Sequence, residues 1–125
     1  MNVVDTSGWL AYFFGSESAD SFSAAIEATE KCLVPTICLY EVFKKITLVA
    51  GEAKALQAVA QMKQGKVVAV TEAVALQAAQ ISIRYKIPMA DSLILATAWL
   101  EQATLLTQDE HFKGLPGVEY IKPAH

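Results

Sequence analysis

The chain opens with NVVDTSGWLAYFF at residues 2–14, where a short apolar run passes directly into a helical pattern. Residues 2–4 predict a strand that ends at Asp5, and residues 7–14 predict a helix that Gly15 stops. The same alternation of short apolar runs and longer helical patterns continues to the end of the chain.

This alternation predicts the fold. We expect further strands at residues 32–34, 67–70, 104–106 and 119–121, and further helices at residues 19–29, 37–50, 52–64, 72–85 and 91–102. Thr36 and Thr71 are expected to cap the helices that follow them, and Gly51 to end the helix before it. Strands separated by helices imply parallel pairing through right-handed crossovers. The sequence therefore predicts an α/β fold, a three-layer α/β/α sandwich with a mainly parallel sheet of four to five strands.

The size of the chain suits one domain, spanning residues 1–125. With 54% hydrophobic and 18% charged residues, it is expected to have a full core and an apolar surface that a partner covers. No apolar run approaches the roughly 20 residues needed to span a bilayer, and no cleavable leader is evident, so no membrane association and a cytoplasmic location are expected. Cys32 and Cys38 lack the spacing of a zinc site or a disulfide framework and are interpreted as small core residues.

The formal net charge of −3 argues against a protein that coats nucleic acid through bulk positive charge. It does not exclude a nuclease. Two divalent cations bound to acidic residues would raise the charge to about +1 and reverse the local sign at the site.

Four acids belong to elements that a parallel sheet would bring to one edge. Asp5 directly follows the first strand, and Asp109 lies three residues after the strand at 104–106. Asp91 opens the helix before that strand, and Glu41 lies at the boundary of the apolar face of the helix at 37–50. Because open α/β sheets bind ligands beyond the carboxyl ends of their strands, these acids form the candidate site.

Each of these acids also has an ordinary structural interpretation. Asp5 and Asp91 are placed to cap helices, Glu41 stands four residues before Lys45 as in a surface ion pair, and Asp109 fits a turn. Together, however, they predict a metal site, because gathered carboxylates repel one another unless a cation neutralises them. Oxygen ligands without His or Cys favour Mg²⁺ or Mn²⁺ over zinc.

Four stretches resemble the four sequence blocks of PIN-domain nucleases, and the resemblance spans essentially the whole chain. They are VVDTS at residues 3–7, PTICLYEV at 35–42, ADSLILATA at 90–98 and LTQDEHF at 106–112. Each block is a weak pattern alone, but four in this order within 125 residues form a fairly specific signal. The chain looks most similar to the short VapC-type toxins of prokaryotic toxin–antitoxin modules.

The resemblance implies a catalytic set of four acids and one hydroxyl, with Thr6 as a further supporting residue: Asp5, Glu41, Asp91, Asp109 and Thr107. The four acids would hold the expected cofactor, Mg²⁺ or Mn²⁺. Some relatives carry a further acid two or three residues after the position of Asp109, where this chain has His111 and Phe112. We expect His111 to be a turn or packing residue rather than a general base.

The implied activity is hydrolysis of RNA phosphodiester bonds, in which one ion would activate a water and a second, if present, would stabilise the leaving oxygen. Four basic residues are candidates for binding the flanking phosphates, although each is equally well interpreted as part of a solvated helix end: Lys44, Lys45, Arg84 and Lys86. The resemblance also implies a homodimer and a cognate antitoxin whose extended segment crosses the active-site groove. The aromatic residues between 9 and 14 are candidates for its docking surface, and half or more of them are equally well interpreted as core.

Two other functions fit parts of the pattern. A phosphatase with an aspartyl nucleophile after the first strand needs a second acid two residues later, where this chain has Ser7. A non-catalytic PIN-like interaction module would use the acids only as helix caps and bind a partner through the apolar surface. That module would be insensitive to Asp91→Asn.

Overall fold

A five-stranded, entirely parallel sheet forms the centre of the protein. The computed structural model describes residues 1–123. The strands are β1 (Asn2–Val4), β2 (Cys32–Pro35), β3 (Lys66–Val68), β4 (Thr104–Thr107) and β5 (Val118–Tyr120). Their order in the sheet is β3-β2-β1-β4-β5, and every neighbouring pair is parallel. The predicted α/β sheet is confirmed, at the upper end of the expected strand number.

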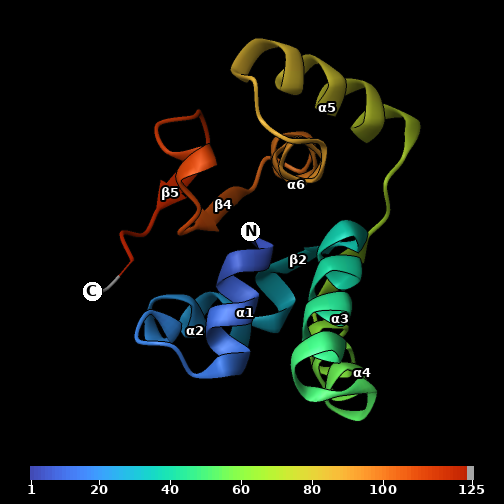
Figure 1. Ribbon diagram of the computed structural model, residues 1–125. Coiled ribbons are helices and arrows are strands. Elements are labelled where there is room, and N and C mark those ends of the chain that lie inside the picture. Colours follow the sequence, from blue (N-terminus) through green and yellow to red (C-terminus); the bar gives the residue numbers. More distant parts are fainter. Residues whose placement is uncertain (124–125) are drawn as a thin grey trace.

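The helices cover both faces of the sheet. They are α1 (Thr6–Phe14), α2 (Ala19–Glu27), α3 (Thr36–Ala50), α4 (Glu52–Met62), α5 (Glu72–Tyr85) and α6 (Met89–Leu100). Short 3₁₀ turns lie at η1 (Thr29–Lys31) and η2 (Glu110–Phe112). In Figure 1, α5 and α6 lie on one side of the strands, α1 and α2 on the other, and the α3–α4 hairpin lies beyond β2. This is the expected three-layer sandwich.

The strand order creates a reversal between β1 and β4. From β1 the chain moves outward to β2 and β3, and it then returns across the sheet to β4 on the opposite side of β1. The carboxyl ends of β1 and β4 therefore lie next to each other, although residues 4 and 107 are far apart in sequence. Open α/β sheets bind ligands at such a switch point.

Several element boundaries differ from those expected. α1 begins at Thr6, because the Asp5 carboxylate caps it by accepting a hydrogen bond from the Gly8 amide. Thr71 caps α5 as predicted, through the amide of Val74. The cap expected at Thr36 is wrong: Thr36 is the first residue of α3, the cap position is occupied by Pro35, and no side chain bonds there.

Four further boundaries are corrected. α6 begins at Met89, so Asp91 lies in its first turn rather than at its start. α2 ends at Glu27, two residues early, because the chain tightens into η1. α4 ends at Met62 rather than at residue 64, and β3 begins one residue earlier than expected. These differences are typical of helix and strand ends, where few side-chain contacts fix the limit.

The core lies between the sheet and its helices. Val3, Val4, Leu33 and Val34 of the central strands are buried, as are both cysteines, which are free thiols as expected. The apolar stripe predicted on α3 is buried only in its first part. Val42 and Ile46 are buried, whereas Val49 and Ala50 at its carboxyl end are exposed. Among residues 1–123, no helix is both long and apolar enough to cross a membrane.

Candidate metal centre

Asp5 is the most deeply fixed of the candidate acids. Its residue is 2% exposed, and both carboxylate oxygens accept hydrogen bonds. Oδ1 accepts from the Ser7 hydroxyl at 2.7 Å and from the Gly8 amide at 3.0 Å. Oδ2 accepts from the Thr107 hydroxyl at 2.7 Å. The end of β1, the first turn of α1 and the end of β4 therefore hold this carboxylate in one orientation.

Thr107 connects two of the acids across the switch point. Its hydroxyl donates to Asp5, and the same oxygen accepts the Asp109 amide at 2.9 Å. Asp109 in turn caps η2 by accepting the His111 amide through Oδ1 at 2.9 Å. A hydroxyl at the last position of β4 thus sets both the Asp5 carboxylate and the backbone that carries Asp109.

Asp91 and Asp109 converge with a histidine. Nδ1 of His111 lies 2.8 Å from Oδ2 of Asp91 and 3.4 Å from Oδ1 of Asp109. One ligand atom from each of these three residues lies within 4.8 Å of the others. His111 is in a turn, as expected, but it is not a packing residue, because its side chain is 57% exposed. His111 was not among the site residues predicted from the sequence. Its position two residues after Asp109 was the signal that could have indicated such a role.

Glu41 faces the same region from α3. Its Oε1 accepts a hydrogen bond from the Thr6 hydroxyl at 2.6 Å. Among the described residues, no ion pair joins Glu41 to Lys45, so the surface-pair interpretation is wrong. Glu41 and Asp5 lie outside the tight group of Asp91, Asp109 and His111.

The electrostatics reflect a concentration of negative charge. Burial raises the pKa of Asp5 from its usual 3.8 to about 6, against hydrogen bonds that lower it, and the nearby charge of Asp109 adds to the increase. Burial also raises the pKa of Asp91, the hydrogen bond from His111 lowers it, and the charges of Asp109 and Glu41 raise it further. The charge of Asp109 therefore acts on both Asp5 and Asp91, and the charge of Glu41 acts on Asp91.

The donor set fits a divalent cation. Carboxylates of four residues and one imidazole nitrogen come from β1, α3, α6 and the segment after β4, which the fold brings to one edge of the sheet. The pKa values of Asp5 and Asp91 are raised mainly by burial and further by neighbouring carboxylates, and a bound cation would favour the charged form of both. Asp5 does cap its helix, as its ordinary interpretation had it, yet Asp91 does not act as the cap of α6.

The fold and these residues define a class of protein: a doubly wound α/β domain with a carboxylate-lined site at the switch point. The sequence matches the PIN domain family over residues 3–118. The chain therefore belongs to the PIN domain family. Among curated proteins, none is similar enough in sequence to be matched with it.

Solved toxin–antitoxin proteins share this fold. A toxin–antitoxin complex from Klebsiella pneumoniae is similar with a TM-score of 0.79 and 25% identity, over 97% of this chain and 100% of that chain. VapC20 from Mycobacterium tuberculosis, described as a sarcin–ricin loop cleaving toxin, is similar with a TM-score of 0.77 and 20% identity, over 93% and 95%. A DNA-bound VapBC from Salmonella typhimurium gives a TM-score of 0.76 and 16% identity, over 96% of each chain. The resemblance to VapC-type PIN domains is confirmed.

Proposed function

We propose that this protein is a metal-dependent endoribonuclease that acts as the toxin of a toxin–antitoxin pair. The observation that carries the proposal is the meeting of Asp5, Asp91 and Asp109 at the switch point of a PIN domain, with Glu41 facing them from α3. The pKa values of Asp5 and Asp91 are raised, and a bound cation would stabilise the charged form of these neighbouring carboxylates.

The acids have different roles in this proposal. Asp5 is the fixed carboxylate, since its oxygens are oriented by Ser7, Gly8 and Thr107. Asp91 and Asp109 are more accessible, with side chains 16% and 32% exposed. Glu41 contributes charge and is oriented by Thr6. Together these four would hold Mg²⁺ or Mn²⁺.

When bound, a divalent ion in such a site supplies a water of lowered pKa and stabilises charge on the phosphate oxygens. The side chains of this chain hold the ion and orient it. No protein nucleophile is needed. This argues against the aspartyl-nucleophile phosphatase, since the residue two positions after Asp5 is Ser7, which donates to Asp5 and is no general acid.

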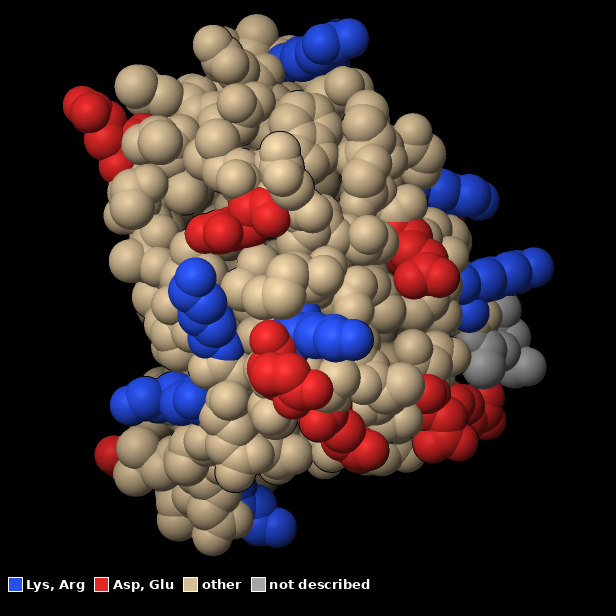
Figure 2. Space-filling model, turned by 180° about the vertical axis from the view of Figure 1, so that it is seen from behind, with Lys and Arg blue, Asp and Glu red and all other residues tan. Residues whose placement is uncertain are grey.

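The substrate we propose is RNA, held largely through its phosphates. On the face seen in Figure 2, basic side chains are interspersed with acidic ones and separated by uncharged surface. Bulk positive charge on this face would therefore contribute little to RNA binding. Four exposed basic residues in the middle of α3 and at the carboxyl end of α5 remain the candidates for phosphate contacts: Lys44, Lys45, Arg84 and Lys86.

A cleavage assay tests the nuclease. Partner-free protein is incubated with total RNA in Mg²⁺, Mn²⁺ or EDTA, beside an Asp91→Asn variant and a Glu101→Gln control, which changes an exposed acid just after α6. We expect discrete fragments with either metal from wild type and control, and none in EDTA or from Asp91→Asn. No cleavage in any lane, with melting temperatures that metal does not change, would favour the non-catalytic interaction module.

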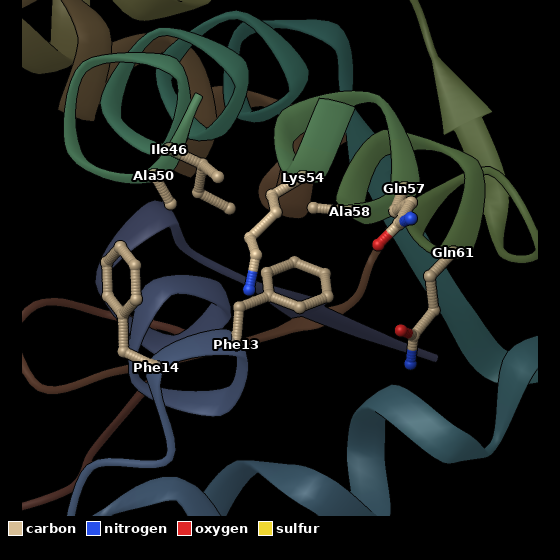
Figure 3. Close-up of a pocket in the computed structure, with 8 residues that line it drawn as sticks. All are labelled: Phe13, Phe14, Ile46, Ala50, Lys54, Gln57, Ala58 and Gln61. Carbon is tan, nitrogen blue, oxygen red and sulfur yellow. The ribbon is translucent and has the colours of Figure 1, made fainter. Parts of the chain in front are cut away.

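The antitoxin is proposed to dock in a groove lined by the aromatic residues at the carboxyl end of α1. The groove has a volume of about 320 Å³ and lies between α1 and the α3–α4 hairpin. Figure 3 shows Phe13 and Phe14 of α1 opposite Ile46 and Ala50 of α3, with Lys54 reaching in from α4. Of the aromatic stretch, Trp9 belongs to the core instead. Solved neighbours of this chain are toxin–antitoxin complexes, which supports an antitoxin partner.

A homodimer is proposed through α5 and the start of α6. Leu76 and Ile83 are exposed and lie on one face of α5, with Ala79 between them. Met89, the first residue of α6, is also exposed. Exposed apolar side chains at this spacing are typical of a helix that packs against a partner. Analytical ultracentrifugation of Ile83→Glu is expected to give monomers. Leu48→Glu, an equally exposed residue of α3, is the control and should leave the dimer intact.

A further inference from the structure

The ring of His111 lies close to two of the candidate metal-binding acids, Asp91 and Asp109. His111 follows Asp109 by two residues, and the turn η2 directs its ring back toward α6. Nδ1 lies 2.8 Å from Asp91 and 3.4 Å from Asp109, whereas more than half of the side chain is open to solvent. The ring is therefore held by the two acids and not by packing.

The spacing of these atoms matches that of ligands on one ion. Adjacent ligands of an octahedral ion with bonds of about 2.1 Å lie about 3 Å apart. The two contacts of Nδ1 fall on either side of that value, and the three candidate ligand atoms lie within 4.8 Å of one another. Small side-chain adjustments would suffice to place one cation between them.

We infer that His111 is a direct metal ligand through Nδ1, together with Asp91 and Asp109, and that this mixed nitrogen and oxygen set makes the centre prefer Mn²⁺ to Mg²⁺. The inference rests on the proposed metal-dependent nuclease and specifies its cofactor. Binding at Nδ1 requires the neutral ring with its proton on Nε2: a neutral ring protonated at Nδ1 transfers that proton to Nε2 through solvent, and a doubly protonated ring releases its Nδ1 proton to solvent.

The preference follows from ligand chemistry. Mg²⁺ is a hard ion that binds oxygen and keeps several waters, so an imidazole nitrogen adds little to its binding. Mn²⁺ shares the preference of Mg²⁺ for carboxylates, but it is a first-row transition ion and binds sites that combine oxygen and nitrogen ligands. A chain with an acid in place of His111 would offer the ion only oxygen ligands. Its preference for Mn²⁺ over Mg²⁺ would then be lost.

Electron spin echo spectroscopy of bound Mn²⁺ tests the inference directly, because a coordinated imidazole gives a nitrogen modulation. We compare wild type with His111→Ala, His125→Ala and Glu110→Gln. His125 is the other histidine of the chain and lies outside the described residues, and Glu110 is an exposed neighbour. The modulation is expected in wild type and both controls and is expected to disappear in His111→Ala. Calorimetric Mn²⁺ affinity should fall about 10-fold or more in that variant, with a smaller change for Mg²⁺.

The outcomes separate this inference from the nuclease. If Mn²⁺ bound to the wild-type protein gives no nitrogen modulation and the protein still cleaves RNA, the ligand role is overturned and the proposed nuclease activity is unaffected. Modulation that survives His111→Ala and disappears in His125→Ala would also overturn it. Nitrogen-bound Mn²⁺ in protein that cleaves no RNA would support the ligand role and contradict the proposed function. If no Mn²⁺ binds to wild type, the ligand inference fails, and cleavage of RNA in Mg²⁺ decides the nuclease separately.

Discussion

The hydroxyl of Thr107 donates a 2.7 Å hydrogen bond to Oδ2 of Asp5, joining residues that are 102 positions apart in the sequence. This bond spans the switch point, since one residue ends β4 and the other follows β1. Thr107 is fully buried and also accepts the amide of Asp109. One side chain therefore couples the stability of the sheet to the arrangement of two acids.

Replacing Thr107 by Val is expected to weaken both the fold and metal binding. The shape is kept, but Asp5 loses a donor and the Asp109 amide loses its acceptor, so the free energy of unfolding should fall by about 1 to 3 kcal/mol. Urea unfolding in EDTA measures the loss, and calorimetry measures Mn²⁺ affinity. Thr107→Ser keeps the hydroxyl and is the control. Equal metal affinity in the Val and Ser variants would contradict the orienting role.

The pH dependence of stability should reveal the buried Asp5. Its pKa is raised from 3.8 to about 6, so between these values the native state binds a proton that the unfolded state lacks. Stability therefore falls as pH rises through this window. Relative to Asp5→Asn, wild type in EDTA should become about 2 to 3 kcal/mol more stable as the pH falls from 7 to 4.

Chemical unfolding at several pH values makes that comparison. Asp20→Asn, which changes an exposed acid of α2, is the control for losing one carboxylate. A constant difference between wild type and Asp5→Asn across the window would show that Asp5 titrates alike in both states. Saturating Mn²⁺ should reduce the decline, because the ion stabilises the charged carboxylate.

The sequence predicted the sheet because its signals are local. Apolar runs of three or four residues, a cap at Thr71 and glycines at 15 and 51 specify elements without knowledge of their neighbours. It also placed Asp5 and Asp109 after two strands, and the parallel order brought these strands together. The end of α2 and the start of α6 were missed. No local residue marks where the chain tightens from α2 into η1 or where the first turn of α6 begins.

The role of His111 depended on information that no local pattern carries. Its neighbour in space is Asp91, 20 positions away, and the contact exists because η2 turns the chain back toward α6. Likewise, the apolar face of α3 is buried only in its first part. Ala50 instead lines the groove beside α1, because the α3–α4 hairpin extends beyond the sheet.

Gly8 permits the close packing of α1, and Gly8→Ala is expected to destabilise the protein. A Cβ there would lie 2.6 Å from Cγ1 of Val4 and 2.7 Å from ring carbons of Phe22. Overpacking of this kind costs about 1 to 3 kcal/mol. Helix propensity alone favours alanine by about 1 kcal/mol, so the two effects have opposite signs. Thermal and urea unfolding measure the change, and an increase in stability would show that α1 can shift away from β1 freely.

The groove beside α1 yields the last prediction, which concerns the antitoxin. Phe14 lines the groove and is 44% exposed, so Phe14→Ser removes apolar contact area without opening the core. Leu100→Ser is the matched control, since Leu100 is 46% exposed on α6, away from the groove-lining residues. We expect the affinity for the co-purifying partner, identified by mass spectrometry, to fall roughly 10-fold or more in Phe14→Ser only. Equal loss in both variants, or none in either, would place the partner on another surface, whereas unchanged RNA cleavage by partner-free Phe14→Ser would separate docking from catalysis.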